Sequence, residues 1–385
     1  MSIYSVPFFR PSIGEEEISA VTECLRSGWL TTGPKTASFE KAFTDFLGGN
    51  VESVAVNSAT AALHLGLEAL GVGPGDEVIV PTLTFTATAE VVRYLGAQPV
   101  FVDIDSMTLC IDPDGVEAAI TQRTKVIMPV HFAGRMCDMT ALRSIADRHK
   151  LCILDDAAHA LPASHQGSMV SKAGADATAF SFYANKTMTT GEGGMLVTAD
   201  PTIASRVRTM RLHGIDRDVF NRFSDPRAGW VYDVVAPGFK YNLTDIASAL
   251  GLVQLQRANT FAQIRAERVA LYNAAFADLP LILPPGPAKG DEHSWHLYIL
   301  QLTEDAPINR DDFILAMKDQ GIGTSVHYRP LHQMTVWKTF CEGSHFPEAD
   351  LVFNRTLSLP LFMAMTDAEQ GRVIEVVRDV LKAPK

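Results

Sequence analysis

A lysine between an apolar run and a glycine-rich turn is the first candidate for chemistry. The run 177–182 leads to Lys186, and the segment 189–194 that follows holds three glycines. A lysine in a partly desolvated place loses its proton more easily and can form an imine with an aldehyde. Ser181, five residues before the lysine, could hold a phosphate. A solvated loop lysine is the alternative, and the flanking phenylalanines and glycines weigh against it.

An acid at the end of another apolar run is the second candidate. The run 151–154 ends in Asp155 and Asp156, and His159 follows. A carboxylate bonded to a pyridine nitrogen keeps that nitrogen protonated, because nearby negative charge favours the cation. A protonated ring of this kind is an electron sink for carbanion chemistry. The alternative is that the two aspartates cap a helix or pair with a surface base.

Two further features could complete a site for a phosphorylated aromatic molecule. Small residues at 57–62 close one strand and open a helix, so the N–H groups of Ala59 and Thr60 could bind an anion. Ordinary capping by Ser58 is the alternative. Phe85 follows the strand-like run 77–81 and could stack on an aromatic ring, although such a phenylalanine is more often part of the core.

The elements that must position these residues alternate between strand and helix over the first 250 residues. Uniformly apolar strands between helices predict an open, doubly wound, mostly parallel α/β sheet. The candidate residues follow its strands, and such sheets bind ligands at the carboxyl ends of their strands. We expect strands at 51–56, 77–81, 99–102, 125–130 and 151–154, with helices after residue 14, at 59–70, and before residues 95 and 149.

The pattern changes near residue 250, where we expect the boundary between a large domain (1–250) and a smaller α+β domain (251–385). The N-terminal segment is free to pack against the smaller domain. A break at 281–287 contains three prolines. The elements expected in this half are a long helix over 244–279, a strand at 295–302, a helix at 311–320, a strand at 324–327 and a final helix at 367–381.

Bulk composition narrows the class of protein. The chain has 385 residues, 47% of them hydrophobic, and a net charge of −11, which argues against a broad nucleic-acid surface. No apolar stretch approaches the roughly 20 residues of a membrane-spanning helix, and the N-terminus does not resemble a signal peptide. The five scattered cysteines suggest free thiols. We therefore expect a cytoplasmic enzyme. His293 and His296 suggest a solvated turn rather than a metal site.

The motifs together resemble one family. DDAAHA (155–160), SFYANK (181–186) and GEGG (191–194) are similar to the DegT/DnrJ/EryC1/StrS family of sugar aminotransferases, and the likeness extends from residues 27–34 to 327–332. The resemblance implies fold type I and the cofactor pyridoxal 5'-phosphate. It makes Lys186 the Schiff-base lysine and Asp156 the partner of the ring nitrogen. The remaining cofactor contacts it implies are Ser181 with Ala59 and Thr60 at the phosphate, Phe85 stacked on the ring, and His159 beside it.

The resemblance also implies a homodimer with shared active sites. The segment 236–242 matches a family element that supplies an asparagine to the neighbouring subunit's phosphate, so Asn242 would act in trans. Candidate contacts to the sugar or the amino donor are Thr31, Thr32, His327 and Arg329.

Four segments, SGWLTTGPK, PVHFAG, APGFKYNL and GIGTSVHYR, are most similar to family members that aminate UDP-4-keto-arabinose for lipid A modification. Phe85 departs from the tryptophan of those enzymes. The expected reaction is a ping-pong transfer from glutamate to a nucleotide-linked, UDP-4-keto sugar. A sugar dehydratase of the same family would carry histidine in place of Lys186, and a catalytically silent regulatory homologue is the other alternative. Residues 71–75 lack the glycine spacing of a nicotinamide dehydrogenase.

Overall fold

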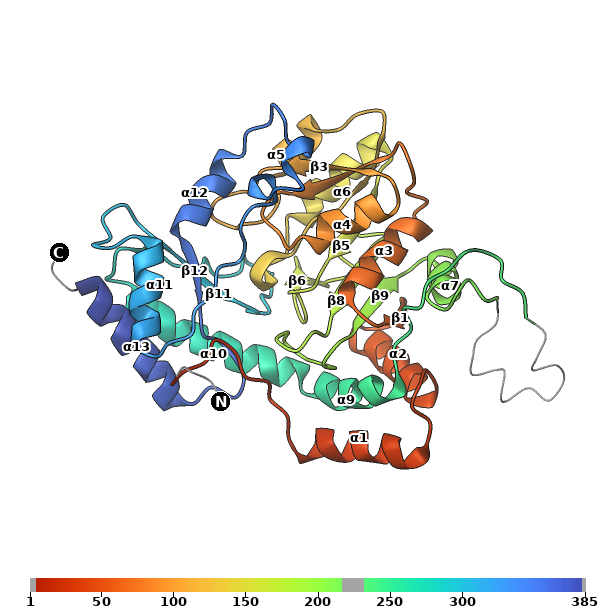
Figure 1. Cartoon of the computed structure of the whole chain (residues 1–385), viewed down its shortest axis with the longest axis horizontal. Helices are drawn as coiled ribbons and strands as arrows, with labels where there is room; N and C mark the ends of the chain where they lie inside the picture. Colours follow the sequence, from red (N-terminus) through yellow and green to blue (C-terminus); the bar gives the residue numbers. More distant parts are fainter. Residues whose placement is uncertain (1–4, 217–231, 383–385) are drawn as a thin grey trace.

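A seven-stranded sheet forms the centre of the larger part of the molecule (Figure 1). The structure, a computed structural model, describes residues 5–216 and 232–382. The strand order is β1-β9-β8-β5-β4-β2-β3, and β9 runs antiparallel to both its neighbours while the other pairs are parallel. The bounds are β1 Glu52–Val56, β2 Glu77–Pro81, β3 Gln98–Val102, β4 Thr124–Ile127, β5 Cys152–Asp156, β8 Ala177–Ser181 and β9 Gly194–Thr198.

Helices cover both faces of this sheet. All residues of the strands β2 and β9 are therefore buried. The helix α3 packs on β8 and β9, and α2 packs on β1. The expected large, mostly parallel α/β sheet is thereby confirmed. The helices of this part are α1 Glu15–Ser27, α2 Pro34–Phe46, α3 Ala59–Ala69, α4 Ala87–Tyr94, α5 Pro113–Ala118, α6 Met139–His149, α7 Pro201–Met210 and α9 Asp245–Gln256, with a short 3-10 turn η1 Phe132–Gly134 and a hairpin of β6 Ser164–His165 and β7 Ser168–Met169.

The C-terminal part contains a three-stranded antiparallel sheet in the order β10-β11-β12. A second hydrophobic core fills the space between this sheet and its helices, and it includes Val6 from the N-terminal segment. The N-terminal segment therefore packs against the smaller part, as Figure 1 also shows. The elements are β10 Leu281–Ile282, β11 Tyr298–Leu302, β12 Thr356–Leu359, α10 Ala258–Phe276, α11 Arg310–Asp319, α12 Pro347–Arg355 and α13 Asp367–Lys382, with 3-10 turns η2 Leu331–Gln333 and η3 Lys338–Phe340.

Two expected elements of this half are wrong. The segment 324–327 forms one bridge, between Ser325 and Ser358, rather than a strand. The chain leaves the sheet there because His327 turns into the cavity described below. The single helix expected over 244–279 is two helices, α9 and α10, which meet at Arg257. The side chain of Arg257 is held there by Glu17 of α1, with 2.7 Å between Nη1 and Oε1.

The predicted domain boundary at residue 250 stays a prediction, and it falls inside α9. Leu255 of α9 belongs to the first core, and so do Leu331 and Val352 from the C-terminal half. Val269 of α10 belongs to the second core. The chain thus crosses from one core to the other along α10 and returns in part from Leu297, since Leu297 and Ile299 also belong to the first core. None of the helices in the described ranges is long and apolar enough to cross a membrane.

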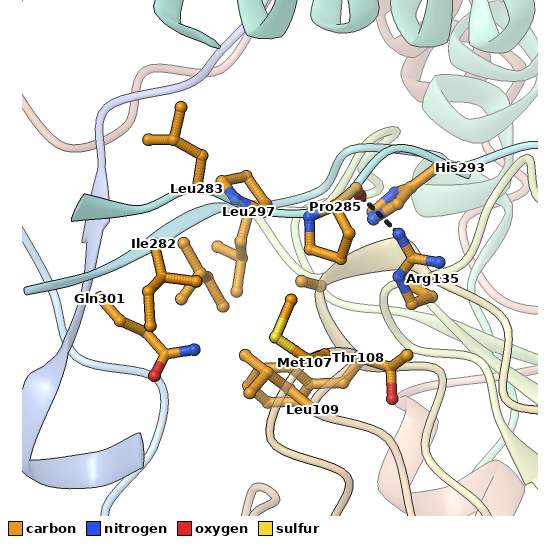
Figure 2. A pocket seen from close by; sticks show the side chains of 14 residues that line it. Met107, Thr108, Leu109, Arg135, Ile282, Leu283, Pro285, His293, Leu297 and Gln301 are labelled. Carbon is orange, nitrogen blue, oxygen red and sulfur yellow. Dashed lines mark hydrogen bonds between the residues drawn. The ribbon is translucent and has the colours of Figure 1, made fainter. Parts of the chain in front are cut away.

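A junction between the two cores is seen from close by in Figure 2. Met107 and Leu109 of the larger part face Ile282 and Leu297 across a cavity of about 30 Å³. A guanidinium nitrogen of Arg135 donates to the carbonyls of Pro285 and Gly286, at 2.5 and 2.7 Å. The cavity has room for about one water molecule. It is therefore a packing junction and not a substrate site.

The start of α3 lies directly against the strand β9. Ser58 caps α3, with its Oγ accepting the N–H of Ala61 at 3.1 Å. A Cβ added at Gly194 would lie 2.5 Å from the carbonyl carbon and oxygen of Ser58. Only a glycine allows this approach, because the obstacle is backbone that cannot rotate away.

We predict that Gly194→Ala lowers the free energy of unfolding by about 1–3 kcal/mol, since the strand must move away from the helix. Gly371→Ala is the matched control, because its new Cβ would meet nothing within 4 Å on the exposed side of α13. We expect that change to raise stability by about 0.5–1 kcal/mol. Urea denaturation measures both variants, and equal stabilities would contradict the close contact.

Candidate active site

A cavity of about 480 Å³ opens where the strands β5 and β8 end. The start of α3 and the segments 84–87 and 327–328 form its other walls. Its size suits a small organic ligand. The predicted residues that line it are Ala59, Thr60, Phe85, Asp156, His159, Ser181, Lys186 and His327.

Lys186 supplies a reactive amine to this cavity. Its side chain is partly buried, and the loss of water lowers its pKa from 10.5 to about 8, although the Asp156 carboxylate opposes that shift. Its backbone N–H donates to the carbonyl of Tyr183 at 2.9 Å, which fixes the turn after β8. Far more of this amine is therefore unprotonated near neutral pH than in an ordinary lysine, as a nucleophile or a general base requires.

Asp156 lies at the end of β5 and is buried. Burial raises its pKa, and two hydrogen bonds act in the opposite direction. The hydroxyl of Thr88 donates to Oδ2 at 2.9 Å and the N–H of Ala158 to Oδ1 at 3.2 Å. A cation placed at this carboxylate would further favour its ionised form. Sequence reasoning missed Thr88, because a threonine inside a helix carries no signal of its partner.

The start of α3 provides an anion site. The Ser58 hydroxyl takes the N–H of Ala61, which leaves the preceding N–H groups of Ala59 and Thr60 at the open end of the helix. Ser181 and Asn185 line the same cavity. The buried Oδ1 of Asn185 has no hydrogen-bond partner within the described chain. A phosphate fits this end, because backbone N–H groups and a hydroxyl can all donate to it.

His159 and Tyr328 form a hydrogen-bonded pair on the cavity wall. Burial, Lys186 and His327 hold the pKa of His159 well below its usual value, so its ring is neutral. Its Nδ1 accepts the N–H of Ala133 at 3.3 Å, so the ring proton is on Nε2, which lies 3.3 Å from the Tyr328 hydroxyl. The Tyr328 hydroxyl oxygen therefore accepts a hydrogen bond from Nε2–H, and its own hydrogen can be donated to a ligand. Sequence reasoning missed Tyr328, although it follows His327 in the HYRPLH motif.

Two more histidines beside this pair are also uncharged. Burial, together with Lys186, lowers the pKa of His327 to about 4, and its Nδ1 lies 2.8 Å from the Ser358 hydroxyl. His296 is buried, with its ring centroid 4.4 Å from that of His159. The solvated turn expected around His296 is wrong. Buried Arg265 donates to the carbonyls of Trp295 and His296, at 3.2 and 3.1 Å, and anchors the segment inside the protein.

Four predicted residues lie outside this cavity. Asn242 Nδ2 donates to the Thr32 hydroxyl at 2.7 Å, and Thr32 in turn donates to the carbonyl of Leu243. The backbone carbonyl of Thr31 accepts a hydrogen bond from the N–H of Asp245. The exposed guanidinium of Arg329 donates to the carbonyl of Gln333. Their roles towards a substrate or a neighbouring subunit stay predictions.

The fold and this cavity together define a transferase of fold type I, in which an amine and a carboxylate face one ligand at the ends of parallel strands. Comparison of the sequence then identifies the family. A profile of the DegT/DnrJ/EryC1/StrS aminotransferase family matches residues 11–378, and the chain belongs to that family. The protein is thus an aminotransferase.

Its relatives cover nearly the whole chain. It is 48% identical over 381 residues to the spore coat polysaccharide biosynthesis protein SpsC of Bacillus subtilis, covering 98% of this chain and 97% of that protein. The structure of Spr1654 from Streptococcus pneumoniae in its PLP-form has a TM-score of 0.90 at 37% identity and covers 98% of this chain and 100% of the other. The sugar aminotransferase CalS13 from Micromonospora echinospora has a TM-score of 0.87 at 28% identity, covering 97% and 99%.

We predict that an amine-acetylating reagent modifies Lys186 of the cofactor-free protein with a midpoint near pH 8. Mass spectrometry of the labelled peptide over a range of pH measures this midpoint. In Asp156→Asn the midpoint moves to lower pH, because the carboxylate that stabilises the ammonium form is gone. A midpoint near 10.5 in the unmodified chain would contradict the burial of the amine.

Proposed function

We propose that this protein transfers an amino group from glutamate to a nucleotide-linked keto sugar, with pyridoxal 5'-phosphate as its cofactor. The single observation that carries the proposal is that Lys186 and Asp156 line one cavity, together with the start of α3. Amine, carboxylate and anion site match the aldehyde, ring nitrogen and phosphate of that cofactor. A structure of Spr1654 in the PLP-form and another in the PMP-form support the choice of cofactor.

The cofactor, when bound, supplies an aldehyde that bonds to amines and a protonated ring that accepts electrons from the adjacent carbon. Asp156 would hold the proton on the ring nitrogen. Ala59, Thr60 and Ser181 would bind the phosphate, and the exposed face of Phe85 would support the ring. His159 would lie beside the ring. The unassigned Oδ1 of Asn185 and the Tyr328 hydroxyl remain available to the substrate.

Lys186 would act twice, first by holding the cofactor and then as the base. Once the donor has displaced it, its free amine would move a proton between the donor's α carbon and the aldehyde carbon. Such proton transfers typically contribute about 10²–10⁴-fold to the rate. Glutamate would leave as 2-oxoglutarate before the keto sugar enters, and the same lysine would return the proton during the second half of this ping-pong reaction.

The sugar belongs to a polysaccharide pathway in this proposal, which the spore coat polysaccharide function named for SpsC supports. We retain a UDP-4-keto sugar as the first substrate to test. The relatives give no support to UDP-4-keto-arabinose in particular. Thr31, Thr32, His327 and Arg329 remain the proposed sugar or donor contacts, and His327 is the one among them that lines the cavity.

Two other functions are disfavoured by the same cavity. The family's sugar dehydratases carry a histidine at the position of Lys186. A silent regulatory homologue would not need an amine with a lowered pKa opposite a buried carboxylate. We also propose a cytoplasmic location, because the five cysteines are free thiols, as expected in a reducing compartment.

We predict that the holoenzyme treated with borohydride carries the cofactor covalently on Lys186. Lys186→Ala should still bind the cofactor at the phosphate and ring but lose turnover by at least about 10²-fold, because its general base is gone. Peptide mass spectrometry locates the adduct, and a panel of nucleotide keto sugars assayed with glutamate measures turnover. An adduct on another lysine, or undiminished turnover, would reject the role of Lys186.

We also propose a homodimer in which Asn242 contacts the phosphate of the neighbouring subunit. Subunits carrying Lys186→Ala or Asn242→Ala should each have little activity. A heterodimer of the two should regain activity in one of its two sites, because that site combines an intact lysine with an intact asparagine. Activity of purified, differently tagged heterodimers measures this, and no recovery would count against the shared site.

A further inference from the structure

Asp155 is a fully buried acid that the proposed mechanism does not use. It is 0% exposed and precedes Asp156 on the strand β5. Successive side chains of a strand point to opposite faces, so Asp155 faces away from the cavity that Asp156 lines. Neither of its carboxylate oxygens has an aligned hydrogen-bond donor within the described ranges. Burying a carboxylate without a partner is costly, so its surroundings need an explanation.

His131 is the neighbour of this carboxylate. Its side chain is also fully buried, and its Nε2 lies 3.2 Å from Asp155 Oδ2. The other ring nitrogen, Nδ1, accepts the backbone N–H of Cys137 at 3.2 Å. Burial opposes a charge on this ring, although Asp155 raises the pKa of His131 overall. Because Nδ1 accepts a hydrogen bond it carries no proton, so the ring is neutral and its proton is on Nε2, the nitrogen that faces Asp155.

Two thiols lie near the pair, and neither provides a positive charge to balance the carboxylate. The thiol of Cys137 donates to the carbonyl of Val130 at 3.2 Å, and burial holds its pKa well above the usual value, so this thiol is uncharged. The Sγ of Cys110 lies 3.9 Å from the carbonyl oxygen of Arg135. His131 is the one ion-pair partner of Asp155 among the residues that the structure describes. A neutral imidazole beside an ionised carboxylate leaves a net charge of about −1 on the buried pair.

Backbone hydrogen bonds tie this charge to Asp156. The N–H of His131 donates to the carbonyl of Asp156 at 3.1 Å, and the N–H of Asp156 donates to the carbonyl of Pro129 at 2.9 Å. These two bonds hold residues 129–131 beside Asp156. In a low-dielectric interior, a charge on one residue acts strongly on its neighbour.

We propose that Asp155 and His131 are a positioning pair, in which neutral His131 directs its Nε2–H group at the Asp155 carboxylate and the pair's negative charge acts through Asp156 to tighten its hold on the cationic ring nitrogen of the cofactor. This inference rests on the proposed function. It assigns a role to two residues that do not touch the cofactor themselves.

The first test is the affinity of the cofactor-free, full-length protein for pyridoxal 5'-phosphate, followed by absorbance. Asp155→Asn keeps the shape of the side chain and removes its charge. We expect the dissociation constant to rise roughly tenfold, as for one unit charge acting nearby in a low-dielectric site. The pH at which the bound cofactor's absorption changes should move to lower values. Asp147→Asn, the same change on the exposed face of α6, should leave both unaltered.

The second test separates a neutral imidazole from a charged one. The amide oxygen of His131→Gln can accept the Cys137 N–H while its NH₂ donates to Asp155, so this variant should bind the cofactor like the unmodified chain. His131→Leu removes the N–H group that faces Asp155, and the affinity of this variant for the cofactor should fall as in Asp155→Asn. Should Asp155→Asn fail to fold by circular dichroism, the contrast between these two His131 variants decides alone.

Three results lead to distinct conclusions. Wild-type protein that binds no cofactor on Lys186 would reject the proposed function itself. Wild-type binding with an unchanged Asp155→Asn affinity, or with equal affinities for His131→Gln and His131→Leu, would overturn the positioning pair and leave the function intact. A tenfold loss restored by glutamine at residue 131 would support both.

Discussion

The site depends on the placement of an amine and a carboxylate where little water reaches them. Burial lowers the pKa of Lys186 to about 8 and at the same time raises the pKa of Asp156. Two groups donate hydrogen bonds to Asp156, a threonine hydroxyl and a backbone N–H. They lower the pKa of Asp156 and leave the lowered pKa of Lys186 unchanged. The result is an amine that loses its proton readily, in the same cavity as a carboxylate that can hold a cation. The neutral histidines around the lysine add no charge that would disturb this balance.

The strand order explains how these groups meet. The strands β5 and β8 are parallel neighbours, and Asp156 is in register with Ala179, so Ser181 emerges two residues farther along the same edge. The strand β9 returns antiparallel and brings Gly194 against the first turn of α3. Two walls of the cavity are therefore set by a single sheet. A loop-built site would not have this rigidity, because loops lack the ladder of backbone hydrogen bonds.

Local patterns explain what could be predicted from the sequence. Lys186, Asp156 and the start of α3 each follow an apolar run, and the ends of such runs meet at one edge of a parallel sheet. His296 and Tyr328 escaped prediction because their burial comes from contacts between distant segments, such as Arg265 with the carbonyl of His296. The strand predicted at 324–327 is reduced to the single bridge between Ser325 and Ser358, and His327 two residues later lines the cavity, a placement that no local pattern indicates.

Arg265 connects the cavity wall to the helix α10. The helix α10 carries it out of the second core, and its guanidinium holds the carbonyl behind His296, which in turn packs on His159 at the cavity wall. Cofactor binding and the docking of the two cores are then linked equilibria, because each stabilises the same wall. Binding of the cofactor should consequently stabilise the packing between the two cores. Substitutions that destabilise the C-terminal core should in turn weaken the affinity for the cofactor.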